Sequence, residues 1–468
     1  MSATSTSPTH RPWLALAVFS YGTLVAAVFS FLIYQRQGMV EATIDLNGFG
    51  SIARNLAHGD GFSIGYGPTT RRGPLYPYLG AVLLKLFGSD APGLSDAVFF
   101  RPLLIANCVV LGLTCVVVWR LAGSIFGPRA ALLAAVICPL VPQSLRYVGM
   151  TEVETLMGLG TVLLAATGLS LVQSPSPGKG AAFGVTAGLT TLAKPVALVY
   201  PLLFLPLAAW HWRKAHALNR NAIVASLTAL ACFAVLLVPW TLRNMSVTNG
   251  QFKGISSNGS GEFLRGYINA QPKYYLLRQD FGGGGPGEKW DPEANAYEEQ
   301  LLKPHGIPFY RPQRDAAGKT TFTPPPPEGV SSASLELAKD RVEGAEVKRR
   351  VLHAPLEFVG KFLVQLATFW YIVETRTKSQ LVGAVALVVL AFSVLGAVRA
   401  QRAGNVVWPV AFTILYFNLI YAAILAFARY SMPLFPTLTV LAAGGLFTLL
   451  GPWLERVRLK RGDGAASR

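Results

Sequence analysis

Residues 221–240 read NAIVASLTALACFAVLLVPW, twenty residues without a charged side chain. A helix needs about 20 predominantly apolar residues to cross the hydrocarbon core of a bilayer, so this run is predicted to span a membrane. Working outward from it, further apolar windows indicate about ten spans in all. The predicted spans are 12–34, 101–122, 128–145, 152–173, 180–193, 195–212, 221–241, 379–398, 406–427 and 432–452.

The composition agrees with an all-α polytopic membrane protein. Of 468 residues, 52% are hydrophobic and only 14% are charged, which is too apolar for a soluble chain of this length. The net charge of +17 is distributed over short loops and the C-terminal tail instead of one face. This pattern predicts contact with membrane lipids and argues against a nucleic-acid partner.

One segment decides the predicted topology. Counting 353–373 as a span would place the basic groups around Arg399 and in the tail on the outer side. Glu357 and Lys361 lie four residues apart, and an aromatic group follows at 369–371, a pattern typical of a helix in the membrane interface. With 353–373 at the interface, both termini are predicted to be cytoplasmic, because basic residues then gather on the inner side.

This topology divides the chain into three regions. Residues 1–241 form an N-terminal transmembrane region with a first outer loop at 35–100. Residues 242–378 form a second outer segment, which ends in the interfacial helix. Residues 379–468 form the C-terminal transmembrane region and a basic tail. GGGG at 282–285 and PPPP at 324–327 predict a mobile lid or docking loop at 281–330.

Asp45 is the most conspicuous acid of the first outer loop. A carboxylate here is suited to accept a proton from a hydroxyl nucleophile. The alternative is a helix cap, because Asn47 and the sequence after it predict a short helix that carries Ile52 and ends at Gly59.

Two glutamates open the predicted fourth span. Residues two apart point to different faces of a helix, so only one of Glu152 and Glu154 is expected to face a common site. Ionisable groups that enter a span are costly and usually functional, and Glu152 is the favoured candidate because it is nearer the interface. The alternative is a local pair between Glu152 and Arg146.

Cationic side chains map to the outer ends of several spans. Guanidinium groups bind phosphates through paired N–H donors and a lysine binds them as a point charge, so this group predicts an anion site. Interfacial anchoring is the alternative for each residue alone. The predicted phosphate ligands are Arg72, Lys194, Arg243 and Arg429, and the predicted substrate-lining residues are Arg71, Tyr76, Arg146 and Tyr430.

Other motifs are missing from the sequence. The histidines show no HExxH or other metal spacing, and GKG at 178–180 lacks the frame of a phosphate-binding P-loop. An enzyme built on this chain therefore needs an activated substrate that itself resides in the membrane.

Five stretches carry a resemblance to a known family, the GT-C glycosyltransferases. The chain is most similar to the branch that contains bacterial relatives of the protein O-mannosyltransferases and the lipid A aminoarabinose transferase. The stretches are IDLNGFGSIARNLAHGDGF at 44–62, RGPLYP at 72–77, TE at 151–152, VPWTLRN at 238–244 and RYSMPLFP at 429–436. Two departures occur: Leu46 stands where many relatives have a second acid, and Gly73 replaces the first proline of the usual ProPro.

The resemblance implies a GT-C fold and a set of roles. Asp45 is the catalytic aspartate of the first outer loop, Arg72 contacts the lipid phosphate, and Glu152 is the acid that opens the fourth span. The implied donor is an undecaprenyl-type polyprenyl-phosphate monosaccharide. Its sugar passes with inversion to an acceptor hydroxyl on a glycan, lipid or protein, at the outer face of a bacterial inner membrane. No cofactor is required, and a divalent metal is compatible with the site.

Two rival functions stay open. A ligase or oligosaccharyltransferase moves a whole lipid-linked glycan, and its pyrophosphate-linked donor needs a wider outer cavity. A lipid or solute transporter requires ionisable groups near the bilayer midplane and broken helices in corresponding halves. Here the predicted spans are nearly uncharged in their middles, which favours chemistry at an interface.

Overall fold

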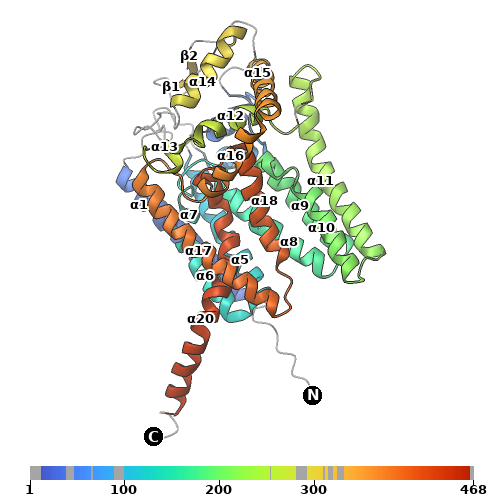
Figure 1. The fold of residues 1–468 in the computed structure, drawn as a ribbon, viewed down its shortest axis with the longest axis vertical. Helices are drawn as coiled ribbons and strands as arrows, with labels where there is room; N and C mark the ends of the chain where they lie inside the picture. Colours follow the sequence, from blue (N-terminus) through green and yellow to red (C-terminus); the bar gives the residue numbers. More distant parts are fainter. Residues whose placement is uncertain are drawn as a thin grey trace.

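A computed structural model describes residues 12–37, 47–64, 67–88, 100–252, 254–280, 292–308, 311–314, 320–323 and 331–463. Most of these residues are helical, and a bundle of long helices carries a cap of shorter elements at one end (Figure 1). We call this end of the bundle the loop end. The helix α20 runs from the bundle away from the loop end (Figure 1).

Seven of the ten predicted spans coincide with helices of spanning length, whereas 128–145, 180–193 and 406–427 fall on the shorter helices α6, α9 and α18. Seven of the described helices are long and apolar enough to cross a membrane, and α6 and α18 are shorter apolar helices. The all-α polytopic fold is therefore confirmed. The bundle helices are α1 (Pro12–Gln37), α5 (Arg101–Phe126), α6 (Pro128–Ile137), α8 (Glu154–Gln173), α9 (Pro177–Ala193), α10 (Tyr200–Lys214), α11 (Arg220–Val247), α17 (Arg376–Arg402), α18 (Trp408–Ile424) and α20 (Phe435–Asp463).

Small residues bring neighbouring helices into close contact. A Cβ atom on Gly180 or Gly184 of α9 would lie 2.1 Å from the carbonyl oxygen of Ala225 or Ala229 of α11. Close backbone approach through glycine four residues apart is typical of helix packing in membranes. This contact fixes α9 against α11, and the C-terminal end of α9 leads directly to Lys194.

The first outer loop folds around two short helices, α2 (Phe49–His58) and α3 (Leu75–Phe87). The predicted helix stop is confirmed, because Gly59 ends α2 in the left-handed region at φ 96°. The predicted cap at Asn47 is wrong: Gly48 precedes the helix with φ 75° and no side chain caps it. The Asn47 side chain instead bonds to Glu152 and Arg72.

The second outer segment supplies the cap over the loop end. Its elements are α12 (Gly259–Asn269), α13 (Pro272–Tyr275), α14 (Pro292–Leu302), the antiparallel strands β1 (Arg311–Arg314) and β2 (Thr320–Thr323), and α15 (Ser332–His353). Arg265 of α12 pairs with Glu298 of α14 at 2.8 Å, and Lys339 of α15 pairs with the same carboxylate. The three cap helices are thus joined by ion pairs.

The two outer segments are packed on each other. Glu336 of α15 accepts hydrogen bonds from the Thr70 backbone N–H at 2.8 Å and from the Thr70 hydroxyl at 2.9 Å. The Ser257 backbone N–H donates to the Thr70 carbonyl at 3.0 Å. The cap therefore holds the stretch of the first loop that leads to Arg71 and Arg72.

The helix α16 (Pro355–Thr368) lies at the loop end of α18. Its buried Lys361 and Gln365 donate to the carbonyls of Ala423 at 2.9 Å and Gly266 at 2.8 Å. On its opposite face Leu356 is 84% exposed. The Lys361 and Phe369 side chains, on which the predicted interfacial position rested, are buried at 3% and 0% exposure, so that position stays a prediction.

Candidate active site

Glu152 lies at the centre of a buried polar cluster at the loop end of the bundle. Its side chain is 0% exposed. Oε1 accepts hydrogen bonds from the Asn47 backbone N–H and from Asn47 Nδ2, both at 3.1 Å. Oε2 accepts from Asn47 Nδ2 at 3.0 Å and from Arg429 Nη2 at 2.7 Å. Both carboxylate oxygens are therefore engaged, and Glu152 ties the first outer loop to the bundle.

Arg429 contacts both Glu152 and Glu154. Its Nε donates to Glu154 Oε1 at 2.6 Å, while Nη2 donates to Glu152. The expectation that only one glutamate faces a common site is wrong. The helix α8 begins at Glu154, so Glu152 precedes it and the helical geometry behind that expectation does not apply.

Lys194 extends this cluster on the side of α9. Lys194 follows the last residue of α9 and precedes Pro195, so the helix ends there. The Lys194 side chain extends to the cluster. Its Nζ lies 3.5 Å from Glu154 Oε1 and 4.4 Å from the centre of the Tyr430 ring. The Tyr430 ring stacks on Tyr421 with centroids 4.6 Å apart. Lys194 thus lies against a stacked pair of aromatic rings.

Arg72 approaches the cluster from the first outer loop. Its Nε donates to the Asn47 carbonyl at 3.0 Å and its Nη2 to Asn47 Oδ1 at 3.1 Å. Asn47 therefore bridges Arg72 and Glu152. Burial and the adjacent Arg71 lower the pKa of Arg72 to about 10, so the guanidinium stays charged at neutral pH.

Arg71 adds a second positive charge at this position. Its Nε is buried and has no hydrogen-bond partner among the described residues. Buried polar groups are normally hydrogen-bonded, and an unpaired donor needs an explanation. Two neighbouring guanidinium groups that repel each other, one with an unpaired donor, fit an anionic ligand.

Gly73 couples Arg72 to Lys194. A Cβ atom at residue 73 would lie 2.4 Å from the Leu192 carbonyl oxygen and 2.8 Å from that of Ala193, the two residues that precede Lys194. The close approach explains why glycine, with no Cβ, stands between Arg72 and Pro74.

We expect Gly73→Ala to push the Arg72 segment away from Lys194 and to lower the free energy of unfolding by about 1–3 kcal/mol, the usual cost of overpacking. The measurement is thermal unfolding of the purified variant in detergent. Gly59→Ala is not a suitable control because of its positive φ, whereas Gly178→Ala at the start of α9 has open space around its Cβ and should unfold as the parent does. An unchanged unfolding midpoint in Gly73→Ala would contradict the close contact.

Three predicted residues lie in other contacts. The Arg243 guanidinium donates to the carbonyls of Thr69 at 2.6 Å and Phe62 at 3.1 Å, so it fastens the first outer loop. Arg146 pairs with Glu374, which replaces the local pair with Glu152 considered from the sequence. Tyr76 is buried at 4% exposure and its hydroxyl donates to an amide oxygen in α5.

Asp45 and Leu46 lie outside the described residues. The nearest described position is Asn47, two residues further along the chain. The hydrogen bonds of Asn47 to Glu152 and Arg72 anchor the segment that follows Asp45.

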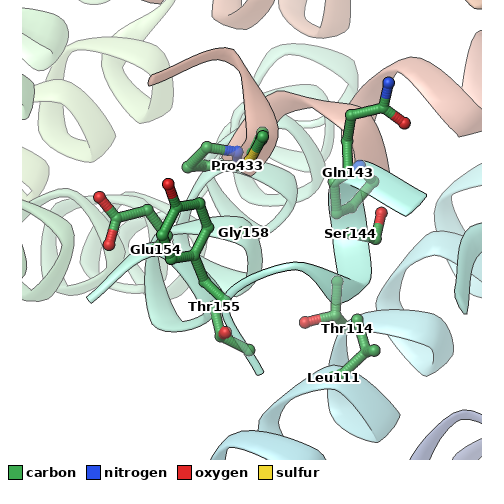
Figure 2. A pocket seen from close by; sticks show the side chains of 11 residues that line it. Leu111, Thr114, Gln143, Ser144, Glu154, Thr155, Gly158 and Pro433 are labelled. Atoms are coloured by element: carbon green, nitrogen blue, oxygen red, sulfur yellow. The ribbon is translucent and has the colours of Figure 1, made fainter. Parts of the chain in front are cut away.

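A small cavity lies beside Glu154, between α5, α7 (Pro142–Leu145) and the segment before α20 (Figure 2). Its volume of about 20 Å³ suits one water molecule and is far below that of a sugar or a lipid headgroup. Glu154 Oε2 and Thr155 Oγ1, from two residues that line it, are buried without a hydrogen-bond partner in the described part of the chain. The volume and the unpaired polar atoms fit an internal water molecule beside Glu154.

Sequence reasoning missed several members of the cluster. Asn47 was expected to cap a helix, and its spacing from Glu152 in the sequence gives no signal of their contact. Glu154 was set aside in favour of Glu152. Among the described residues, no group of three or more His, Cys, Asp or Glu side chains is placed to hold a metal ion.

Comparison with protein families gives one match that includes much of this site. Residues 71–240 match the family model described as dolichyl-phosphate-mannose-protein mannosyltransferase. The matched range begins at Arg71 and contains Glu152 and Lys194. A search of curated proteins found no match.

Solved structures of one archaeal enzyme show the same fold. The oligosaccharyltransferase AglB from Archaeoglobus fulgidus, in complex with an inhibitory peptide and a dolichol-phosphate, superposes with a TM-score of 0.56 at 16% identity, over 97% of this chain and 52% of that one. Its apo form gives 0.53 at 16% identity over the same shares. The chain thus spans about half the length of that enzyme. ArnT from Cupriavidus metallidurans, bound to undecaprenyl phosphate, matches with a TM-score of 0.36 at 14% identity, over 94% and 80%.

The fold and the family match define the class of protein: a multi-pass membrane protein with the fold of the GT-C glycosyltransferases. The resemblance drawn from the sequence motifs is therefore confirmed.

Proposed function

We propose that this protein transfers a monosaccharide from a polyprenyl-phosphate donor to an acceptor hydroxyl at the loop end of its helix bundle. The observation that carries the proposal is the placement of Arg72, Arg71 and Lys194 around a buried carboxylate cluster within the stretch that matches the family. These three cations can bind a lipid phosphate, and the stacked Tyr421 and Tyr430 rings beside Lys194 can contact the sugar that it carries.

The proposed reaction is one inverting displacement. Asp45 accepts the proton of the acceptor hydroxyl, and the hydroxyl oxygen forms a bond to the anomeric carbon. The bond between that carbon and the phosphate oxygen breaks, and its electron pair stays on the phosphate. The phosphodiester thereby becomes a phosphate monoester and gains negative charge, which the neighbouring cations stabilise.

The cations divide between two tasks. Arg72 is oriented by Asn47, and Lys194 is held near Glu154, so both are positioned before the donor arrives. Arg71 has an unpaired donor and is the group best able to meet the charge that develops on the leaving phosphate. Arg429 is already engaged by two carboxylates, which favours a positioning role over direct phosphate binding.

Glu152 acts in this scheme by positioning. Its two oxygens receive four hydrogen bonds from Asn47 and Arg429, which leaves it poorly suited to take a further proton. Its role is to hold Asn47, and with it the segment after Asp45 and the Arg72 guanidinium. The scheme assigns the phosphate charge to protein cations and calls on no metal ion or nucleotide.

We further propose that the loop end faces the outside of a bacterial inner membrane and that both termini are cytoplasmic. The basic residues at the opposite end of the bundle, such as Arg399 and Arg402 in the last turn of α17, support this orientation. A polyprenyl-phosphate sugar presented on the outer leaflet would then reach the site laterally from the bilayer.

We expect Arg72→Ala to weaken binding of undecaprenyl phosphate by about 10- to 100-fold, since charged hydrogen bonds contribute roughly 1.5–3 kcal/mol. The measurement is a titration of detergent-purified protein with the lipid. Arg399→Ala, at the far end of α17, is the matched control and should bind as the parent does. Equal affinities of Arg72→Ala and the parent would remove Arg72 from the phosphate site.

The oligosaccharyltransferase alternative keeps one supporting observation, the fold shared with AglB. The two functions differ in the transferred group, because an oligosaccharyltransferase moves a whole lipid-linked glycan instead of a single sugar. A transporter is disfavoured because the buried ion pairs of Arg429 with Glu152 and Glu154 lie at the loop end of the bundle instead of at midplane depth.

A further inference from the structure

Glu262 lies in the first turn of α12, a cap helix to which the sequence motifs assign no role. The start of this helix is fixed next to the arginine pair. Ser257 bonds to Thr70 through its backbone N–H at 3.0 Å and through its hydroxyl at 2.8 Å. Arg71 and Arg72 follow Thr70, and α12 begins two residues after Ser257.

The Glu262 side chain is on the face of α12 that packs toward the bundle. Residues four apart lie one above the other on a helix, so Glu262 shares a face with Gly266. A Cβ atom on Gly266 would lie 2.3 Å from the carbonyl oxygen of Ile424, the last residue of α18. Arg429 and Tyr430 follow Ile424 within six residues, so this face of α12 packs on the part of the bundle that leads to Arg429.

One oxygen of this carboxylate is held and the other is available. Asn258 Nδ2 donates to Glu262 Oε1 at 2.7 Å, which fixes the side chain. In the described part of the chain, Oε2 has no hydrogen-bond or ion-pair partner, and the residue is half-buried. The carboxylate still acts on the site, because Glu262 and Glu152 oppose the lowering of the Arg72 pKa caused by burial and Arg71.

A carboxylate at this place is unsuited to the donor. It would repel the phosphate that Arg72 is proposed to bind, whereas it readily accepts a hydrogen bond from a hydroxyl or amino group. Glu262 belongs to the cap over the loop end. With the proposed orientation, an acceptor that comes from outside the membrane would pass the cap.

We propose that Glu262 binds the acceptor through a hydroxyl group next to the reacting one, and that the acceptor is accordingly a polyhydroxylated molecule such as a sugar residue of a glycan. This inference rests on the proposed function and adds the acceptor class to it. Glu262 Oε2 accepts the hydrogen bond of the second hydroxyl and thereby orients the first one toward the donor.

The test separates transfer from donor hydrolysis. The donor is the polyprenyl-phosphate lipid fraction of the source cells, labelled in its sugar with carbon-14, and the acceptor is the envelope fraction of cells that lack this protein, titrated by mass. Transfer is read as label in the envelope fraction. Hydrolysis is read as free sugar in reactions without that fraction, where water replaces the acceptor.

Glu262→Gln is expected to raise the envelope concentration at half-maximal transfer about 10-fold or more. Hydrolysis should stay within twofold of the parent, and undecaprenyl phosphate should bind no more weakly than it does to the parent, because a repelling charge is removed. Glu293→Gln, a cap residue paired with Lys273 near the surface, is the control and should behave as the parent. Unchanged transfer in Glu262→Gln overturns the inference, and so does an equal loss of hydrolysis, which would assign Glu262 to the donor.

Two further outcomes concern the acceptor class and the proposed function. Label that enters protein instead of glycan in the parent reaction overturns the polyhydroxylated acceptor. A parent protein that neither binds undecaprenyl phosphate nor transfers label overturns the proposed function itself, a result distinct from a failure confined to Glu262→Gln.

Discussion

Asp45→Asn is expected to lower transfer by about 10²- to 10⁴-fold, the range that a positioned general base contributes. Asparagine has nearly the same shape as aspartate but cannot accept the proton of the acceptor hydroxyl at neutral pH. Binding of undecaprenyl phosphate should stay within about twofold of the parent, because the proposed phosphate ligands Arg72 and Lys194 are unchanged.

The measurement is transfer of labelled sugar at saturating donor, together with lipid titration of the same preparation. Asp60→Asn is the matched control, since Asp60 is an exposed acid of the same outer loop at the end of α2. Full turnover in Asp45→Asn would remove the base from the mechanism. Loss of lipid binding together with turnover would instead point to a structural role.

Arg429→Gln is expected to have the largest effect on stability. Arg429 is 8% exposed and pairs with Glu152 at 2.7 Å and Glu154 at 2.6 Å. Removing one partner of a buried ion pair leaves an uncompensated buried charge and costs about 3–5 kcal/mol. In this cluster two carboxylates lose their main partner at once, so we expect a large fall in the midpoint of thermal unfolding in detergent.

A rescue variant separates charge from packing. Adding Glu152→Gln and Glu154→Gln to Arg429→Gln removes the buried negative charges, so the triple variant should recover a large part of the lost thermal stability. It should stay inactive, because Asn47 and Lys194 lose their carboxylate partners. A triple variant no more stable than Arg429→Gln would show that the loss arises from packing.

The fold was largely predictable because it depends on local patterns. A long apolar window predicts a spanning helix from local sequence alone. The windows at 221–241 and 432–452, for example, fall within α11 and on α20. The segment at 353–373 is helical as α16 over Pro355–Thr368, and its place at a membrane interface stays a prediction. The cap was not predicted, because its helices are joined by ion pairs between distant residues, such as Arg265 with Glu298.

The site was predictable in its residue types but not in its pairings. Glu152, Arg72, Lys194 and Arg429 were selected from their places at span ends, and the structure brings all four into one cluster. Which cation meets which carboxylate depends on where a helix begins to within one or two residues. The start of α8 at Glu154 is such a case, since it lets two glutamates meet one arginine.

Asn47 illustrates the same limit. An asparagine ahead of a helix is most simply read as a cap, because its side chain commonly accepts the first free backbone N–H groups. Here its amide instead bonds to Glu152 and Arg72, which lie 105 and 25 residues away in the sequence. Contacts over such separations leave no local pattern.

The central claim is that the site holds a polyprenyl phosphate with a single sugar, and native mass spectrometry of the gently purified protein tests it most directly. We predict a bound lipid with the mass of a polyprenyl phosphate, alone or with one sugar, that is lost in Arg72→Ala. A pyrophosphate-linked glycan at the site, or the absence of any polyprenyl lipid from preparations that keep other lipids, would contradict the account.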